Sequence, residues 1–485
     1  MRHHLFGASL LFGTVSVSAW LLGAALAIAQ VPPPPDKGPE KKPPPAPPTS
    51  SYDQISPVLL GKEKFADMMA KDKADKAGVI ERHQKFLEYR YDLTAHPDAK
   101  VKMTRGKPIQ VGPTVRLVRG TTWESLAEMT PDEIRDQNLL PPGFLPLPHP
   151  KHDVGGMLFT QTQIKALPRL QRFDLDFDIP DHFLPEFPPP IFLTTRSDLG
   201  DVSQGKLVTV ENFQEIFQGI LNAKQLDGVR LLVTQFPQQQ FNATADRKTE
   251  HAIGMQGVAC FDCHVNGHTS AATHLIGDIR PQTHRRRIDT PSLRGVNIQR
   301  LFGSQRALKT VEDFTEFEQR AAYFDGDPVS ATAKGINPLE RGSQVQSMSE
   351  FQELLDFPPA PGLGIDGKLD PRKFAANSPE MKGQTLFFGK GKCATCHPAP
   401  YYTDNTMHNL QVDRFYNPQM INGLMATKQG PIKTFPLRGI KESPPYFHDG
   451  RLLTLEDTVE FFNLILETKL TAEEKQDLVA FLRQL

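Results

Sequence analysis

Two five-residue stretches decide the organisation of this chain: Cys260-Phe261-Asp262-Cys263-His264 and Cys393-Ala394-Thr395-Cys396-His397. Both follow the pattern C-x-x-C-H, and they use all four cysteines among the 485 residues. Two thiols at this spacing can add to the two vinyl groups of one porphyrin, and the adjacent histidine can then bind its iron. We therefore predict two covalently attached haem c groups, each anchored by the two cysteines of its motif, with His264 and His397 as iron ligands.

Three other uses of paired cysteines fit this pattern less well. A zinc site needs four ligands per metal, and a redox C-x-x-C does not require a following histidine in both copies. A disulfide framework is an alternative for an exported protein. Because two complete copies of one motif account for every cysteine, we expect haem attachment and no cysteine left for disulfides.

The sequence after the second motif repeats the sequence after the first. Leu293-Arg294-Gly295 corresponds to Leu437-Arg438-Gly439, and Glu312 and Glu456 both lie 19 positions after the leucine. This gapless register predicts two related haem domains. The second ends in a helix that Thr471 begins, with a glutamate three positions later. One face of that helix is apolar and suited to core packing, and its residues are Leu478, Phe481, Leu482 and Leu485.

Composition excludes several classes of protein. The chain has 55 Lys and Arg against 56 Asp and Glu, a formal net charge of −1, so no basic surface for nucleic acid is expected. A hydrophobic fraction of 39% argues against wholesale disorder. The 43 prolines are about double the usual share of roughly 5%, which predicts many irregular connections.

The first residues have the features of a leader for export. An uncharged run from Leu10 to Ala29 follows Arg2 and ends in Ala27-Ile28-Ala29, the small-x-small pattern that signal peptidases cut. We expect a mature chain that begins near Gln30 and lies in the periplasm. The alternative is an uncleaved membrane anchor, because the run approaches the ~20 residues that span a bilayer.

The expected organisation has five parts. These are a signal peptide (1–29), a proline-rich extended linker (30–50), an irregular family-specific region of unknown role (51–205), and haem domains over 206–375 and 376–485. In the third part we expect a helix over 62–93 and another that begins at Thr130-Pro131. Its histidines, His149, His152 and His182, are scattered, so we expect surface or core positions for them.

The second haem segment resembles the bacterial dihaem cytochrome c peroxidases and their relatives of the MauG type. The similar stretches are Leu386–Cys393, Tyr402–Asn405 with His408-Asn409, Pro445–Arg451 and Leu478–Leu482. The likeness is weaker in the first haem segment and ends before about Gly205, so it covers roughly half of the chain. It implies two mainly helical cytochrome c-like domains that face each other, one haem handling peroxide and the other passing or storing electrons.

The resemblance also implies site residues. Glu312 matches the distal glutamate of the peroxidatic haem, and Gln299 is a looser match to the glutamine that accompanies it. Glu312 has an alternative role as a helix-start carboxylate, as its repeat partner Glu456 does. The displaceable sixth ligand of the first haem would be His268, His274 or His284, and His284 lies roughly where the family has this ligand.

Two positions depart from the family pattern. Phe462 stands where the family ligates the second haem through Met or Tyr, and phenylalanine has no lone pair for an iron. The second haem is then five-coordinate, or another residue reaches it, and the candidates are Met407, His408, Met420 and Met425. Arg294 stands at about the place of the family's bridging tryptophan, and the tryptophans present are Trp20 and Trp123.

These observations lead to one leading hypothesis and two others. The first is an exported dihaem oxidoreductase that reduces hydrogen peroxide with electrons from a small donor protein, a cytochrome or a cupredoxin. The second is a MauG-like or oxygenase-like enzyme that acts on an organic or protein substrate. The third is an electron-transfer cytochrome without enzymatic activity. The family often carries a calcium ion between the haem domains, which no acidic loop marks here, and a homodimer is also compatible with the resemblance.

Overall fold

The computed structural model describes residues 63–152, 155–239, 255–275, 287–320, 341–425 and 429–485. The chain forms two compact units, 1–47 and 48–485, and every described residue belongs to the second. The predicted leader, the proline-rich linker and His284 lie outside these ranges. Within them, no helix combines the length and apolar character needed to cross a bilayer.

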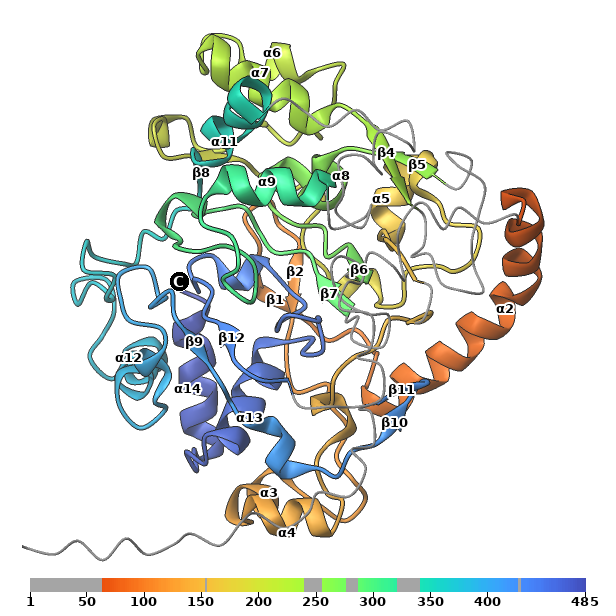
Figure 1. Cartoon of the computed structure of the whole chain (residues 1–485). Coiled ribbons are helices and arrows are strands. Elements are labelled where there is room, and N and C mark those ends of the chain that lie inside the picture. Colours follow the sequence, from red (N-terminus) through yellow and green to blue (C-terminus); the bar gives the residue numbers. More distant parts are fainter. Residues whose placement is uncertain (1–62, 153–154, 240–254, 276–286, 321–340, 426–428) are drawn as a thin grey trace, which may run out of the picture. The chain divides into compact units, whose positions relative to one another are not determined.

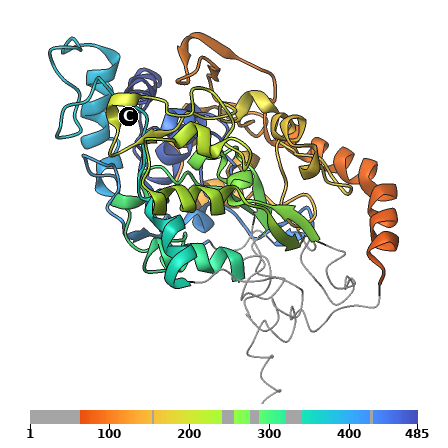
Figure 2. The same cartoon turned by 90° about the horizontal axis from the view of Figure 1, so that it is seen from above.

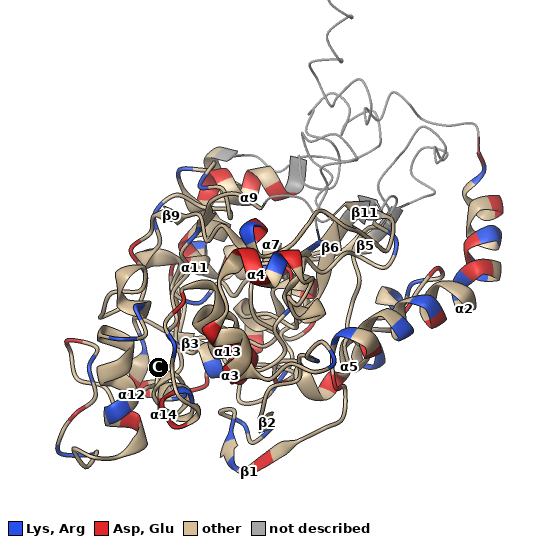
Figure 3. Ribbon diagram, turned by 90° about the horizontal axis from the view of Figure 1, so that it is seen from below, with Lys and Arg blue, Asp and Glu red and all other residues tan. Residues whose placement is uncertain are grey.

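The front region begins with one long helix. This helix, α2 (Phe65–Arg90), corresponds to the helix predicted over 62–93 and runs along one edge of the unit in both views (Figures 1 and 2). Basic and acidic residues are interspersed along its length (Figure 3), as is typical of a solvated face. The strands β1 (Pro97–Lys102) and β2 (Pro108–Gln110) then form an antiparallel pair.

Three short helices follow, each started by a threonine. They are α3 (Trp123–Glu128), α4 (Pro131–Asp136) and α5 (Gln161–Ala166). The predicted start at Thr130-Pro131 is confirmed: Thr130 accepts the backbone N–H of Glu133, whose side chain accepts the Thr130 N–H in return. Prolines interrupt the chain between these helices, so long elements cannot form there.

Two pairs of helices cross at a glycine, one pair in each predicted haem segment. In the first, α7 (Ala223–Val233) packs against α11 (Gln346–Gln352). A Cβ at Gly228 would lie 2.0 Å from the backbone oxygen of Ser347, so only glycine permits this approach. In the second, α12 (Pro379–Phe388) packs against α14 (Ala472–Leu482), where a Cβ at Gly383 would lie 1.9 Å from Asp477 O. In both segments, therefore, a glycine allows two helices to pack in close contact.

The remaining elements are short. The helices are α6 (Phe213–Phe217), α8 (Cys260–Cys263), α9 (Val311–Arg320) and α13 (Leu455–Ile465). The strands form two-stranded antiparallel pairs, β3 (Phe192–Leu193) with β8 (Leu355–Asp356), β4 (Phe236–Gln239) with β5 (Met255–Val258), β6 (Thr273–Leu275) with β7 (Arg287–Asp289), β9 (Met407–His408) with β12 (Ile432–Lys433), and β10 (Met420–Ile421) with β11 (Leu424–Met425). The described part is therefore only partly helical.

The main hydrophobic cluster joins the front region to the second haem segment. Front residues such as Leu87 and Leu126 share it with residues of α13 and α14. At one contact the ring centre of Phe144 lies 5.1 Å from that of Phe461 and 5.7 Å from that of Trp123. A second cluster spans residues 191–355 and holds the first haem segment together. Burial of apolar area is the main stabilising contribution, so the front region is part of the second segment's core.

Candidate functional site

The first C-x-x-C-H stretch forms a single helical turn. Cys260 and Cys263 lie three residues apart on α8, a spacing that places both thiols on one face. Asp262 fixes this turn, because its carboxylate accepts the Ala259 N–H at 2.7 Å and pairs with Arg169 at 2.7 Å. The backbone N–H of His264 donates to Cys260 O at 2.9 Å, and this hydrogen bond closes the turn with the histidine at its end.

The second stretch forms a turn that the same backbone hydrogen bond closes. Cys393 starts a 3-10 turn (Cys393–Thr395) after Lys392, which has a left-handed backbone at φ 58°. The N–H of His397 donates to Cys393 O at 2.9 Å, as the N–H of His264 does to Cys260 O. Both motifs therefore present two thiols and one imidazole from a compact turn.

A backbone carbonyl orients each motif histidine. Nδ1 of His264 lies 2.9 Å from Pro291 O, and Nδ1 of His397 lies 2.7 Å from Tyr402 O. A ring nitrogen facing a carbonyl must carry the proton, so Nε2 keeps the lone pair that a metal needs. Burial supports the neutral ring, since it lowers the pKa of His264 to about 4 and also lowers that of His397. Both rings therefore have the neutral form and the tautomer that iron ligation through Nε2 requires.

The cysteines are available for thioether bonds. All four are free thiols in this structure. Burial raises the pKa of Cys260 and of Cys393 to about 12, which keeps them as neutral thiols at physiological pH. Within the described ranges, no group of three or more His, Cys, Asp or Glu side chains is arranged to hold a metal ion. Two thiols and one imidazole in each motif are the donor set that haem c attachment uses.

The repeat found in the sequence is also a repeat of backbone structure. Gly295 and Gly439 both have a left-handed backbone, with φ 73° and 71°, and each begins a single 3-10 turn. Nine and fifteen positions after the leucine, an isolated antiparallel bridge forms in both copies, Phe302 with Leu308 and Tyr446 with Leu452. The equivalence of the two segments is therefore structural.

The two copies differ at the glutamates that the repeat aligns. Glu456 pairs with Arg483 at 2.7 Å. Glu312 lies half-buried in the first turn of α9 and makes no hydrogen bond or ion pair within the described part of the chain. Burial and the nearby carboxylate of Glu312 raise the pKa of Glu353. A carboxylate left without a partner in one copy alone favours a role beyond helix capping.

Gln299 is buried and makes a specific contact across the repeat. It follows the 3-10 turn Val296–Ile298, is 6% exposed, and its Oε1 accepts a hydrogen bond from Lys433 Nζ at 3.0 Å. In the described residues no hydrogen bond joins Gln299 to Glu312 or to either motif histidine. The structure thus brings Gln299 to the second segment rather than to Glu312.

The candidates for the sixth ligand of the first haem have different surroundings. Both ring nitrogens of His268 are engaged, Nδ1 with Ser292 Oγ at 2.8 Å and Nε2 with Glu442 O at 2.9 Å. His274 lies on β6, where burial and the nearby His264 lower its pKa to about 4. His284 lies outside the described residues. In this conformation His268 connects Ser292 of the first segment to Glu442 of the second.

The candidates for the sixth ligand of the second haem are spread over the segment. Phe462 lies on α13, with its ring 5.3 Å from Phe461. His408 and Met407 lie on β9, and His408 Nε2 is 2.7 Å from Asp404 Oδ2. Met420 and Met425, which are 62% and 42% exposed, face each other across the β10–β11 hairpin.

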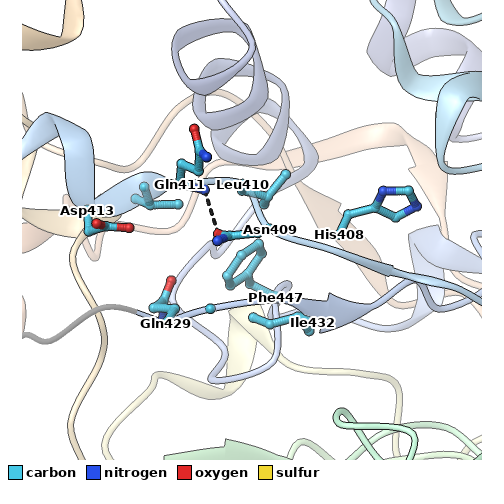
Figure 4. Close-up of a pocket in the computed structure, with 10 residues that line it drawn as sticks. His408, Asn409, Leu410, Gln411, Asp413, Gln429, Ile432 and Phe447 are labelled. Carbon is cyan, nitrogen blue, oxygen red and sulfur yellow. Dashed lines mark hydrogen bonds between the residues drawn. The ribbon is translucent and has the colours of Figure 1, made fainter. Parts of the chain in front are cut away.

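A pocket lies beside the loop that follows the second motif. Its lining includes residues 408–413, Gln429, Ile432 and Phe447 (Figure 4). In this view the side chain of His408 is directed away from the other labelled residues. Phe447 has φ 74°, a left-handed value that is rare for a bulky side chain, whereas its repeat partner is Gly303 at φ 77°. The same backbone bend thus presents an aromatic ring in one copy and none in the other.

Sequence reasoning did not identify several residues that the structure places at these sites. Glu318, the repeat partner of Phe462, raises the pKa of Cys260 and Cys263, after the larger effect of burial, and so lies close to the first motif. Arg294 is buried and pairs with Glu442 at 3.1 Å. Aligning the two repeats by position would have pointed to Glu318, whereas nothing in the sequence signals the Arg294–Glu442 pair.

Comparisons with known proteins support the resemblance. No protein-family model matches the chain. Cytochrome c551 peroxidase of Nitrosomonas europaea is 33% identical over 147 residues, which are 29% of this chain and 42% of that protein. Cytochrome-c peroxidase IdrP2 of Denitromonas iodatirespirans is 29% identical over 160 residues, 25% of this chain and 43% of its own. MauG of Methylorubrum extorquens is 30% identical over 130 residues, 23% and 35% of the two chains.

Two solved structures are similar over a larger share of the chain. Hydrazine synthase of Kuenenia stuttgartiensis has 20% identity and a TM-score of 0.35, covering 58% of this chain and 93% of that one. A MauG-like protein associated with microbial copper homeostasis has 20% identity and a TM-score of 0.33, covering 47% and 83%. The chain spans less than half the length of each curated relative described above. These relatives are cytochrome c peroxidases and MauG, as the motifs predicted.

Proposed function

We propose that this chain is an exported dihaem c-type oxidoreductase that reduces hydrogen peroxide with electrons from a small cytochrome or cupredoxin. The observation that carries the proposal is the shared geometry of the two motifs. In each, two free thiols precede a neutral histidine whose Nδ1 is bound to a backbone carbonyl. The curated relatives that are cytochrome c peroxidases support the reaction.

The chain's own residues divide into anchors and ligands. Cys260 and Cys263 would hold one haem by thioether bonds with His264 as its ligand, and the second motif would hold the other through Cys393, Cys396 and His397. When bound, each haem supplies an iron that can change oxidation state and, with an open position, accept a small ligand. The carbonyls of Pro291 and Tyr402 hold the two imidazoles in the tautomer that this ligation needs.

The reaction also needs a group that moves protons. Reducing one hydrogen peroxide to two waters consumes two electrons and two protons, so an acid/base must lie near the reacting oxygens. Glu312 is the predicted group and is a carboxylate without a partner in the described residues. Glu318 lies closer to the anchoring cysteines. Either carboxylate could hold a proton at its Oε atoms and pass it to the substrate.

The arrangement in tandem haem domains over 206–375 and 376–485 is part of the proposal. It is supported by the glycine-dependent helix crossings at Gly228 and Gly383 and by the repeated turns at Gly295 and Gly439. Export to the periplasm rests on the leader-like residues 1–29. We include no nucleic-acid partner, and a homodimer and a calcium ion remain predictions from the family resemblance.

A MauG-like or oxygenase-like activity is the second candidate. The specific observation is Phe462, which lies on α13 where the family has a Met or Tyr ligand. An open position at the second iron would suit a small oxidant and an organic or protein substrate. A peroxide-generated oxidised haem spectrum that persists without a donor and disappears with such a substrate would favour this candidate over the first.

The test uses the haem-loaded full chain. A mature-protein mass with two added haems and peroxide-dependent oxidation of a reduced small cytochrome are the expected results. Glu312→Gln and Glu318→Gln then identify the acid/base, since loss of that group costs about a hundredfold or more in rate. A six-coordinate spectrum for both irons, inert to cyanide and without turnover, would instead indicate a simple electron carrier.

A further inference from the structure

The front region packs directly on the first C-x-x-C-H motif. Residues 157–170, which include α5, lie beside β5 (Figure 1). Apolar side chains of this segment form a buried cluster with Val258 of β5, and Cys263 packs against that cluster. The completely buried Gln163 also donates from Nε2 to Asp262 O. A segment for which the family resemblance gives no role is therefore in contact with the turn that carries the two thiols.

Arg169 makes a two-point ion pair with the central residue of this motif. Its two NH groups donate to Oδ2 and Oδ1 of Asp262 at 2.8 and 2.7 Å. One of them also donates to Gly257 O at 3.0 Å, which fixes the guanidinium beside the turn. The Asp262 carboxylate, 3% exposed, accepts the Ala259 N–H that starts α8. Bidentate pairs of this kind are among the strongest hydrogen-bonded contacts in proteins.

The second motif has no counterpart of this pair. Thr395 stands at the position of Asp262 and is exposed, and its N–H donates to Lys392 O of its own segment. Among the residues that the structure describes, no hydrogen bond or ion pair joins the front region to residues 393–397. In this part of the chain, the charged contact with the front region is confined to the first motif.

A charge at the attachment turn affects the electron affinity of the haem that the turn anchors. Reduction adds one electron and removes one positive charge from the iron centre, so a nearby carboxylate disfavours it and a nearby cation favours it. Next to a buried group such an effect is screened less than in water. While Arg169 and Asp262 are paired, their opposite charges largely cancel.

We infer that Arg169 is a positioning residue for the first haem: it holds the attachment turn and neutralises Asp262, so that the front region sets the reduction potential of this haem and not of the second. The inference rests on the part of the proposed function that places a haem c at the first motif. It goes beyond that proposal by giving the front region a role in redox chemistry, which neither the motifs nor the Leu-Arg-Gly repeat implies.

The experiment measures the midpoint potentials of both haems in the haem-loaded full chain at pH 7, by optical titration with dithionite and ferricyanide. Asp262→Asn removes the carboxylate but keeps an oxygen for the Ala259 N–H, and Arg169 stays charged. The double variant, Asp262→Asn with Arg169→Met, removes both charges. Arg169→Met alone is avoided, because a buried carboxylate that loses its cation is strongly destabilising.

The matched control is Asp198→Asn. Asp198 forms the same two-point contact with Arg196 in the front region, at 3.0 and 2.9 Å. Within the described residues, neither side chain hydrogen-bonds to a motif residue. Glu318, the other carboxylate near the thiols of the first motif, is the same in every variant.

We expect Asp262→Asn to favour reduction of the first haem by about threefold to tenfold, a rise in midpoint of about 28 to 59 mV for one electron. The double variant should return this midpoint to near the wild-type value. The second haem's midpoint, and both midpoints of Asp198→Asn, should not move. A variant without the cysteines of the first motif identifies the first haem's midpoint by its absence. Intact mass and thermal unfolding check that each variant is loaded and folded.

An unchanged or lowered first midpoint in Asp262→Asn would overturn the inference. A rise that the double variant keeps or enlarges would also overturn it, since a loosened turn and not the charge of Arg169 would then be the cause. Equal shifts of both midpoints would show that the front region does not act on one haem alone. The expected potentials without peroxide turnover would reject the proposed reaction and leave the role of Arg169 standing, whereas turnover with unchanged potentials would reject the inference alone.

Discussion

After the shared Leu-Arg-Gly turn, the two repeats have the same bends but different side chains. The first continues Gly303-Ser304-Gln305-Arg306, and the second continues Phe447-His448-Asp449-Gly450. In the second, Asp449 pairs with the fully buried Arg451 and accepts the N–H of Leu147 at 2.9 Å from the front region. In the first, Gln305 is exposed and donates to Pro431 O. The side chains thus diverge where the front region docks.

The difference separates two kinds of constraint on the molecule. Turns and helix crossings depend on glycine and on backbone hydrogen bonds, and they are alike in both repeats. Buried charges depend on particular neighbours, and they occur where the front region supplies carbonyls and N–H groups, as Phe144 does for Arg451. The front region thus stabilises the second repeat at Asp449 and Arg451, and it stabilises the first segment elsewhere, as Arg169 does at Asp262.

The largest expected effect concerns haem attachment in each repeat. Replacing both cysteines with alanine, in a Cys260/Cys263 variant and separately in a Cys393/Cys396 variant, should remove one haem from the mature protein. The reason is that each pair anchors one porphyrin and no other cysteine can substitute. Intact-mass spectrometry measures the loss. Retention of both haems in either variant would contradict the assignment of the motifs.

A smaller effect is expected from the buried acid of the second repeat. Asp449→Ala leaves the fully buried Arg451 without its carboxylate, and breaking such a pair typically costs about 3–5 kcal/mol. The matched control is Gln305→Ala at the same position of the first repeat, which is expected to change the unfolding free energy by less than about 0.5 kcal/mol. Urea denaturation compares them. Equal losses would show that the repeats are stabilised alike.

A third prediction concerns the acid sensitivity of the front region. His149 is completely buried, and burial together with Arg172 and Arg287 lowers its pKa to about 3. Between pH 6.5 and about 3 the unfolded chain binds a proton that the folded chain does not, so stability falls as the pH falls. At pH 5 the loss from this group is about 2 kcal/mol.

The variant His149→Gln cannot titrate and so isolates this contribution. Between pH 7 and pH 5 its unfolding free energy should fall by about 2 kcal/mol less than that of wild type. Urea denaturation at the two pH values gives both numbers. Parallel behaviour of the two proteins would mean that the ring is protonated in the folded state.

The smallest effect tests the left-handed bend that the two repeats share at Gly303 and Phe447. Gly303→Ala places a Cβ where φ is 77°, which costs about 1–2 kcal/mol even though no atom lies within 4 Å of it. Gly450→Ala, at φ 72° in the second repeat, adds close contact with Pro445 Cγ at 3.0 Å and should cost more. Thermal unfolding ranks the two variants. A neutral Gly303→Ala would show that the first repeat tolerates a different bend.

The sequence predicted the local parts of the fold and of the candidate site. The C-x-x-C-H turns, the repeated Leu-Arg-Gly bends and the threonine caps at Thr130 and Thr471 depend on neighbours within a few residues, so their patterns are visible in the chain. The expectation of a mainly helical fold is met only in part. Much of the described chain lies in turns and short strand pairs, as its prolines favour.

The parts that could not be predicted depend on contacts between distant residues. The merging of the front region with the second segment rests on pairs such as Thr114 with Asp457, whose sequence separation leaves no periodic signal. Likewise, Gln299 was assigned by family resemblance, but its bond to Lys433 is visible only in three dimensions. Glu318 could have been predicted from the sequence, because the repeat aligns it with Phe462.

The aromatic cluster of Trp123, Phe144 and Phe461 gives the molecule an optical reporter of its own. The sequence has two tryptophans, Trp20 in the predicted leader and Trp123, and Trp123 sits where the front region meets the second segment. Fluorescence from Trp123 therefore reports on that boundary. Separation of the front region would expose the indole to water and change its emission.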